Sequence, residues 1–186
     1  SVMDCGPLHR LSGWRRAVLK FFWFTWPLSR VRLVTTISEA TRQELIRLTG
    51  VSPAKVKVVH CCVSPEFIWS PAAFNAQRPR LLLLGTAPNK NLERMAAALV
   101  GLPCLVELIG TPSSAQAAAF AANGIELQAH GDVSDTDILA AYTRCDLVLF
   151  ASTHEGFGLP IVEGQAIGRP VVTSNCSSMA EVAADS

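Results

Sequence analysis

Apolar and polar residues follow a regular rhythm in the second part of the chain. After residue 80, short runs that are apolar throughout alternate with stretches whose apolar positions recur every three to four residues. Strands covered on both faces are apolar at every position, so this rhythm predicts a parallel sheet with helices on both faces. The predicted strands are residues 81–84, 105–109, 125–127, 147–150 and 170–173, and the predicted helices are residues 92–100, 115–122, 135–145, 160–167 and 178–184.

The first part of the chain predicts fewer elements. Residues 31–37 and 56–59 have the composition of short strands, and a helix is expected between them over residues 39–48. Ser38 precedes this helix and Gly50 follows it, which are the residue types that begin and end helices. The first part is therefore expected to be a partial α/β segment.

Residues 64–79 are rich in Pro, Ala and Ser and show no period, which is typical of a linker. The predicted organisation is a partial domain over residues 1–63, a linker over residues 64–79 and a Rossmann-like domain over residues 80–186. The chain begins at what resembles a strand end and stops at a helix. We therefore expect both ends to have been cut from a longer protein, with the second domain truncated.

Residues 14–26 combine aromatic and basic side chains and are followed by Pro27, which is expected to end the helix. Arg15, Arg16 and Lys20 can share one face of a helix, as in helices that lie on a membrane surface. The alternative is a core helix packed beneath a sheet. Apolar residues occupy more than one face, which favours the core helix.

The charge is unevenly distributed along the chain. Residues 1–60 hold ten Lys or Arg against three Asp or Glu, whereas residues 61–186 hold six against twelve. The basic part could face an anionic membrane or an anionic substrate, or it could be an ordinary solvated surface. The longest apolar run, residues 18–28, is too short to span a bilayer and contains Lys20.

The potential metal ligands are scattered. The six cysteines include no Cys-x-x-Cys pair, and His9, His60, His130 and His154 are isolated in sequence. This pattern predicts no metal site, and it predicts cysteines that act as small core residues in a reducing cytoplasm. A cytoplasmic protein is expected, with peripheral contact to the inner face of a membrane as an open alternative.

The segment from His154 to Glu163 carries the strongest chemical signal. Glu155 and Glu163 enclose Gly156-Phe157-Gly158-Leu159-Pro160, directly after an apolar strand. Glycines allow close backbone approach, and the amides at a helix start attract anions. A carboxylate such as Glu163 can accept hydrogen bonds from two neighbouring hydroxyls. The alternative is an ordinary strand-to-helix turn in which Glu163 only complements the helix dipole.

The same residues match the E-x7-E motif of retaining glycosyltransferases of family 4, which have the GT-B fold. The resemblance extends over nearly the whole chain, in the family's order. It includes Gly85-Thr86-Ala87-Pro88-Asn89-Lys90-Asn91-Leu92, the segment 135–150, Gly168-Arg169-Pro170-Val171-Val172-Thr173-Ser174-Asn175, and Thr35-Thr36-Ile37-Ser38-Glu39-Ala40-Thr41. The resemblance implies that residues 1–63 end an acceptor domain and that residues 80–186 bind a nucleotide sugar.

The resemblance also implies roles for single residues. Lys90 would bind the donor diphosphate, Glu155 would act beside the transferred sugar as the catalytic residue, and Glu163 would bind ribose hydroxyls. The backbone of the remaining donor-binding residues would contact phosphate, sugar or nucleoside; these are Gly85, Gly110, Val133, Gly156, Phe157, Gly158 and Leu159.

Three positions depart from the family pattern. Thr86 and Asn89 stand where arginine is common, so one phosphate-binding cation is missing unless Arg169 or Arg144 replaces it. Met3 stands where a histidine is common.

The function expected from the resemblance is transfer of a sugar from a nucleoside diphosphate sugar to a glycan or lipid-linked acceptor, with retention of configuration. The setting would be polysaccharide or lipopolysaccharide assembly. No metal, other cofactor or nucleic acid takes part in this scheme. Two alternatives stay open, an epimerase or phosphorylase-like enzyme of the same fold, and a non-catalytic module that binds a nucleotide sugar.

Overall fold

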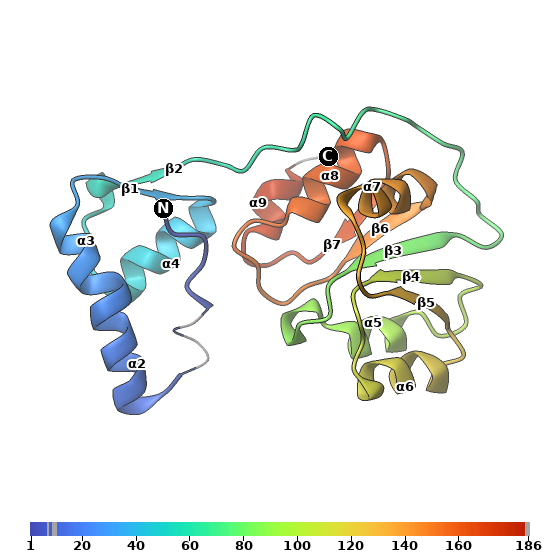
Figure 1. The fold of residues 1–186 in the computed structure, drawn as a ribbon, viewed down its shortest axis with the longest axis horizontal. Helices are drawn as coiled ribbons and strands as arrows, with labels where there is room; N and C mark the ends of the chain where they lie inside the picture. Colours follow the sequence, from blue (N-terminus) through green and yellow to red (C-terminus); the bar gives the residue numbers. More distant parts are fainter. Residues whose placement is uncertain (7, 9–10, 185–186) are drawn as a thin grey trace. The chain divides into compact units, whose positions relative to one another are not determined.

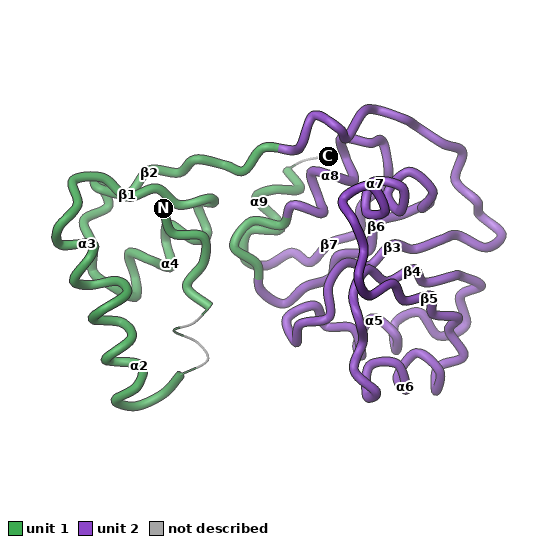
Figure 2. The backbone as a smooth tube through the Cα atoms, in the orientation of Figure 1, with its two compact units in different colours: residues 1–62, 155–158, 177–184 green, residues 63–154, 159–176, 185–186 purple. Residues whose placement is uncertain are grey.

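The computed structural model describes residues 1–6, 8 and 11–184, and these fall into two compact units (Figure 2). Unit 1 consists of residues 1–62, 155–158 and 177–184, and unit 2 contains residues 63–154 and 159–176. The chain therefore leaves unit 2 for four residues and then returns. Each unit is described by itself.

Unit 2 is built on a five-stranded parallel sheet with the strand order β5-β4-β3-β6-β7 (Figure 1). Every neighbouring pair of these strands is parallel. Continuously apolar strands suit this arrangement because both faces of the sheet are covered. The strands are Arg80–Leu84 (β3), Leu105–Ile109 (β4), Glu126–His130 (β5), Leu147–Phe150 (β6) and Val171–Thr173 (β7).

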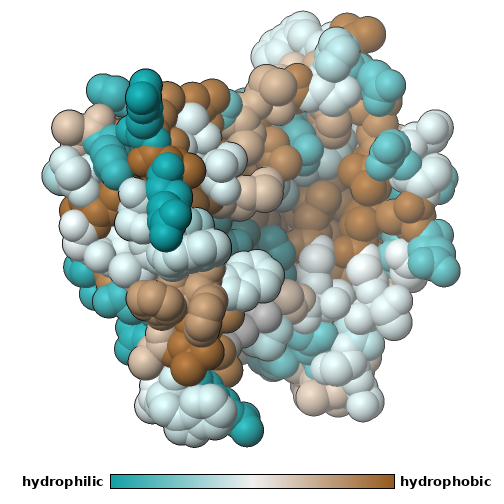
Figure 3. All heavy atoms as spheres, turned by 60° about the vertical axis from the view of Figure 1, so that its left-hand side comes forward, coloured by the Kyte–Doolittle hydropathy of each residue, from teal (hydrophilic) through white to brown (hydrophobic). Residues whose placement is uncertain are grey.

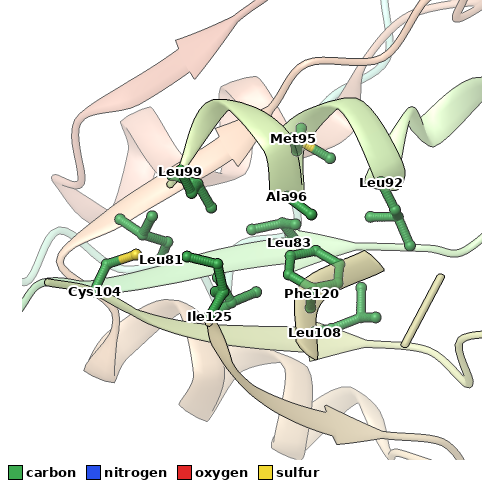
Figure 4. Packing of buried hydrophobic residues seen from close by; sticks show 11 residues of the cluster. Leu81, Leu83, Leu92, Met95, Ala96, Leu99, Cys104, Leu108, Phe120 and Ile125 are labelled. Atoms are coloured by element: carbon green, nitrogen blue, oxygen red, sulfur yellow. The ribbon is translucent and has the colours of Figure 1, made fainter. Parts of the chain in front are cut away.

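Helices Leu92–Ala98 (α5) and Ser114–Ala122 (α6) cover one face of this sheet, and Asp135–Arg144 (α7) and Leu159–Ile167 (α8) cover the other (Figure 1). Figure 4 shows the core under α5, where side chains of this helix meet the leucines of β3 and Phe120 of α6. Burying each large apolar side chain stabilises the fold by roughly 1.5–3 kcal/mol.

These elements confirm the predicted Rossmann-like α/β class, with strands and helices alternating along unit 2. The boundaries shift by up to three residues, since β5 extends to His130 and α5 ends at Ala98. A 3₁₀-helix at Pro88–Lys90 was not predicted. The final helix, Met179–Ala183 (α9), lies in unit 1 rather than on the sheet.

Glu107 of β4 is a charged residue inside the sheet, with a fully buried side chain. Arg80 donates to Glu107 Oε2 at 3.2 Å, and Arg144 donates from Nε to the same oxygen at 3.0 Å and from Nη2 to Oε1. Burial alone raises the pKa of Glu107, but its hydrogen bonds and charge pairing with Arg144 and Arg80 bring it below the ordinary value. Because Arg144 ends α7, this network ties the helix to the strands beneath it.

Unit 1 is a smaller α/β body. Strands Val34–Thr36 (β1) and Val56–Val58 (β2) are parallel, and Val2 adds a parallel bridge at Thr36. Helix Glu39–Thr49 (α4) begins as predicted, because Ser38 Oγ accepts the Thr41 amide, and it ends at Gly50 in the left-handed conformation. Its core contains residues from every part of the first 56 positions, namely Cys5, Leu8, Phe24, Leu28, Val34, Leu45 and Val56.

The aromatic helix of unit 1 does not end where it was predicted to end. Helix Gly13–Leu19 (α2) continues through a π-helix at Lys20–Thr25 into helix Trp26–Arg30 (α3), so Pro27 does not end it. The wider turn lies just before Pro27. A proline has no backbone N–H to donate, and its ring needs more space than a regular helical turn provides. The helix packs into the core of unit 1 through Phe24 and Leu28, while Trp14 and Trp23 are 72% and 74% exposed in these 186 residues.

Within the described residues, no helix is both long and apolar enough to cross a membrane. Of the six cysteines, Cys5, Cys104 and Cys145 are buried as core residues, whereas Cys62 and Cys176 are exposed. The prediction that the cysteines fill the core is therefore correct for half of them.

Glu107→Gln should lower the free energy of unfolding by about 2–3 kcal/mol, because it removes charge-assisted hydrogen bonds from a buried position. Since folding lowers this pKa, the stabilisation is present at neutral pH and should fade as the pH falls through the lowered value. Urea unfolding followed by circular dichroism measures the loss. The control is Glu126→Gln, which removes an exposed pair with Arg78 and should cost less than about 1 kcal/mol. Equal losses in both variants would contradict the assigned role of Glu107.

Candidate functional site

The predicted site residues of unit 2 lie at the carboxyl ends of its parallel strands. The chain passes from β3 to β4 on one side and from β6 to β7 on the other, so the strand order reverses between β3 and β6. In open parallel sheets, ligands bind beside this reversal. The loops that follow β3 and β6 are joined there, because Thr153 N donates to Asn89 O at 2.8 Å and Asn89 Nδ2 donates to His154 O at 2.9 Å.

Lys90 belongs to the 3₁₀-helix Pro88–Lys90 that follows β3 at this edge of the sheet. Its ammonium lies 4.6 Å from the centre of the Phe150 ring at the end of β6. Its side chain also passes over Gly85, where an added Cβ would come within 3.0 Å of Lys90 Cε. Gly85 has a φ of +84°, which few other residues adopt. The Phe150 ring attracts the ammonium, and the lack of a side chain on Gly85 leaves room for the Lys90 chain, so together they hold the cation in place.

The loops after β4 and β5 approach the same edge closely. An added Cβ on Gly110 would meet Thr86 at 3.0 Å, and one on Gly131 would meet Thr111 at 2.8 Å. Gln116 at the start of α6 donates to Thr86 O at 2.9 Å and fixes the loop after β3. Val133 lies half-buried in the loop between β5 and α7. Gly85, Lys90 and Gly110 are thus gathered at the carboxyl edge of the sheet.

Glu163 has a partner that the sequence did not reveal. The buried Tyr142 of α7 donates its hydroxyl proton to Glu163 Oε2 at 2.5 Å. Burial raises the pKa of Glu163, and the hydrogen bond from Tyr142 offsets part of this rise. Burial beside Glu163 also raises the pKa of Tyr142, so the phenol keeps its proton and remains a donor. One carboxylate oxygen is therefore held by the protein, and Oε1 is the other acceptor.

Helix α8 places Glu163 through close packing against the sheet. The helix begins at Leu159, so Pro160 is its second residue and Glu163 opens the second turn. An added Cβ on Gly164 would lie 2.8 Å from a methyl group of Val171 and 3.0 Å from one of Val148. Gly164 thus allows α8 to approach β6 and β7 closely, and this closeness fixes the depth of Glu163.

The loop that carries Glu155 belongs to unit 1, and its carbonyl groups are anchored there. Ser38 Oγ and Thr41 Oγ1 donate to Gly156 O at 2.7 and 3.0 Å. Ser178 Oγ donates to Glu155 O at 3.0 Å and to Phe157 O at 2.8 Å. An added Cβ on Gly156 would lie 2.2 Å from Met3 O, so only glycine fits against this strand end. The two glutamates of the motif thus lie in different units, joined by the chain.

Further contacts in unit 1 tie α9 to the start of α4. Glu181 accepts hydrogen bonds from the Glu39 and Ala40 amides at 2.8 and 3.1 Å, which satisfies donors at the helix N-terminus. His60 lies 3.1 Å from the same carboxylate, and its ring is 5.9 Å from that of Phe157. The side chain of Phe157 is therefore a packing element of unit 1.

The two arginines considered as possible replacement cations make other contacts. Arg169 is buried and donates to Ser70 O at 2.6 Å and to Thr143 O at 2.5 Å. Arg144 is bound to Glu107. Among the described residues, no group of three or more His, Cys, Asp or Glu could hold a metal ion, and His9 lies outside them.

Three residues that hold the predicted site residues in place were not predicted from the sequence. Tyr142 holds Glu163, Phe150 supports Lys90, and Asn89 joins the loops after β3 and β6. A signal for Tyr142 exists, since it is the single tyrosine of the chain and lies on a helix facing the sheet. Phe150 has no comparable signal, because an aromatic residue in an apolar strand reads as core.

Two family models match the chain. The model described as "Glycosyl transferases group 1" matches residues 86–186, which is more than half of the chain. The model described as "Glycosyltransferase Family 4" matches residues 6–67. The two matches follow one another along the chain and correspond to its two predicted parts.

Curated relatives are similar at low identity. Serotype-specific mannosyltransferase WbdA of Escherichia coli is 27% identical over 179 residues, which covers 82% of this chain and 22% of the relative. O-antigen chain mannosyltransferase B of Escherichia coli is 28% identical over 179 residues, covering 85% of this chain and 47% of the relative. The chain therefore spans less than half the length of these relatives.

The fold is shared with solved structures. The crystal structure of Anabaena Alr3699/HepE in complex with UDP and glucose has a TM-score of 0.76 and 18% identity, and the match covers 97% of this chain and 53% of that chain. The similarity confirms the GT-B type of architecture.

Gly164→Ala should destabilise the fold by about 1–3 kcal/mol, although alanine favours a helix, because the added methyl group meets two rigid valines. Urea unfolding measures the effect. Val171→Ala should also destabilise, by removing a methyl contact. The double variant should lose less stability than the two single losses added together, because alanine at position 171 makes room for the new methyl group. Additive losses would show that the close approach of α8 is not what requires glycine.

Proposed function

Because this chain belongs to the glycosyl transferases group 1 family, we propose that it forms the donor-binding part of an enzyme that transfers a sugar from a nucleoside diphosphate sugar. The proposed reaction retains the anomeric configuration. The acceptor is a glycan or a lipid-linked glycan. The scheme uses no metal and no other cofactor.

The observation that carries the proposal is the carboxylate of Glu163, held on one oxygen by Tyr142. Vicinal hydroxyl groups, such as those of a ribose, are matching donors for a carboxylate whose orientation is already fixed. A residue that only complemented a helix dipole would need neither a buried phenol nor a close-packed helix.

Lys90 is the proposed partner of the donor diphosphate. Negative charge grows on the leaving diphosphate as the bond between sugar and phosphate breaks. A cation held in advance by Phe150 and Gly85 stabilises that charge without rearranging. The backbone of Gly85, Gly110, Val133 and of residues 156–159 supplies the further donor contacts in this proposal.

Glu155 is the proposed catalytic residue beside the transferred sugar. Positive charge develops on the anomeric carbon during transfer, and a carboxylate nearby stabilises it. The backbone of Glu155 is fixed by Ser177, whose hydroxyl donates to Glu155 O at 2.7 Å, and by Ser178. A fixed backbone keeps the carboxylate within a narrow range of positions.

The curated relatives support a hexose as the transferred sugar and surface polysaccharide as the product. Both Escherichia coli relatives are mannosyltransferases, and one of them acts on the O-antigen chain by its name. Mannosyl donors are therefore the first to test. The alternative is a module that binds a nucleotide sugar without transferring it. Formation of a glycosylated acceptor distinguishes the proposed enzyme from such a module.

A nucleoside diphosphate should raise the thermal unfolding midpoint of the 186-residue chain, because a ligand that binds only the folded state stabilises it. Lys90→Ala should weaken binding on the order of tenfold to a hundredfold, as expected for losing a hydrogen bond between charged groups. Calorimetric titration with GDP and UDP measures both affinities.

The control for this prediction is Arg94→Ala, which removes an exposed cation from α5 and should leave the affinity unchanged. Two results would contradict the donor site. One is the absence of any stabilisation at millimolar nucleotide, and the other is equal weakening by the two substitutions.

A further inference from the structure

Residues 67–75 form a segment of unit 2 that has neither helix nor strand and lies before β3 in the chain. We name this segment the strap, because it passes α8 and α7 and is held by both (Figure 1). Hydrophobic residues are exposed at many places on the surface (Figure 3), so exposure alone marks no functional residue. One strap residue is distinguished by its contact, since the Phe67 ring packs against Tyr142, the phenol that holds Glu163.

Contacts at Ser70 fasten the strap close to Phe67. Ser70 N donates to Ile167 O, at the end of α8, at 3.1 Å. The buried Arg169 donates to Ser70 O at 2.6 Å and to Thr143 O, near the end of α7, at 2.5 Å. One guanidinium therefore joins the strap to α7. Hydrogen bonds from a charged donor are the strong ones, so the strap is held firmly enough to fix the place of Phe67.

The rings of Phe67 and Tyr142 meet edge to face. Their centres lie 5.2 Å apart, and the angle between their planes is 79°, which is a favoured aromatic geometry. The torsion that turns a tyrosine ring is otherwise broad. Because the hydroxyl proton of a phenol lies in the plane of its ring, the orientation of the ring decides where that proton points. Phe67 thus bears on the hydrogen bond from Tyr142 to Glu163 without touching the carboxylate through its own contact.

We propose that Phe67 is a positioning residue for recognition of the donor ribose. By setting the ring of Tyr142, it keeps the phenol proton on Glu163 Oε2 and leaves Oε1 for a ribose hydroxyl. Phe67 acts through these two side chains and not by contact with the nucleotide. The inference rests on the proposed donor site, but the hold on Tyr142 belongs to the free protein and is measured without any nucleotide.

Nuclear magnetic resonance of the single tyrosine of the chain tests this hold directly. With ¹³C-labelled tyrosine the chain gives one Cζ signal, and the signal of a phenol bonded to a carboxylate shifts when that carboxylate takes up a proton. The wild-type signal should therefore show a step with pH at the raised pKa of Glu163. Phe67→Ala should shrink this step to about half or less, since the freed ring bonds Glu163 only part of the time.

The matched control is Phe74→Ala, which removes the same type of side chain from an exposed position of the strap and should leave the step unchanged. Phe67→Leu keeps an apolar side chain over the phenol, so it guards against misfolding and should recover part of the step. Thermal unfolding checks that each variant is folded.

Calorimetric titration connects the hold on Tyr142 to the ribose. The probes are GDP or UDP, whichever binds more tightly, and its 3′-deoxy form. Phe67→Ala should weaken ribonucleotide binding about threefold to tenfold and binding of the 3′-deoxy form less, so the discrimination between them shrinks. In a Tyr142→Phe background the same substitution should change the discrimination no further, because the hydroxyl through which Phe67 acts is gone.

Two results would overturn the role of Phe67. One is a tyrosine step that Phe67→Ala leaves intact in a folded variant. The other is a loss of discrimination that is equally large with and without the Tyr142 hydroxyl, which would make Phe67 a structural residue only. Absence of nucleotide binding by the wild-type chain would refute the donor site and the assignment to ribose with it. The tyrosine signal distinguishes that outcome, because it needs no nucleotide.

Discussion

The reversal of strand order between β3 and β6 is the constraint on which the rest of unit 2 depends. Parallel strands place all their carboxyl ends at one edge, and the reversal sends the following connections in opposite directions. Two loops then meet at one point and must satisfy each other's backbone groups, which Asn89 and Thr153 do. Lys90 lies on one of these two loops, and the other loop leads along the chain to Glu155.

Supporting contacts give this edge its chemical precision. Phe150 and Gly85 fix Lys90, while Tyr142 and Gly164 fix Glu163. The Glu107 network holds the end of α7, two residues from Tyr142, so a buried ion pair inside the sheet bears on the carboxylate at its edge. Fixing side chains in advance lowers the free-energy cost of binding, which is the physical link between packing and the proposed donor recognition.

Much of this was predictable from the sequence, because continuous apolar runs and capping residues are local signals. The strands of unit 2, the Ser38 cap and the edge position of Lys90 all follow from such signals. The continuation of the aromatic helix through the π-helix at Lys20–Thr25 did not follow, because a proline after an apolar run is read as a helix end. The pairing of Tyr142 with Glu163 joins residues 21 positions apart and depends on how two helices meet.

The titration of Glu163 tests the central claim most directly. The chemical shift of its carboxyl carbon, followed against pH by nuclear magnetic resonance, should report a pKa above the ordinary value in the free protein. Ribose hydroxyls that donate to the carboxylate favour its charged form, so a nucleoside diphosphate should lower this pKa, and a 3′-deoxy nucleotide should lower it less. A nucleotide that binds without moving the pKa of Glu163 would contradict the account.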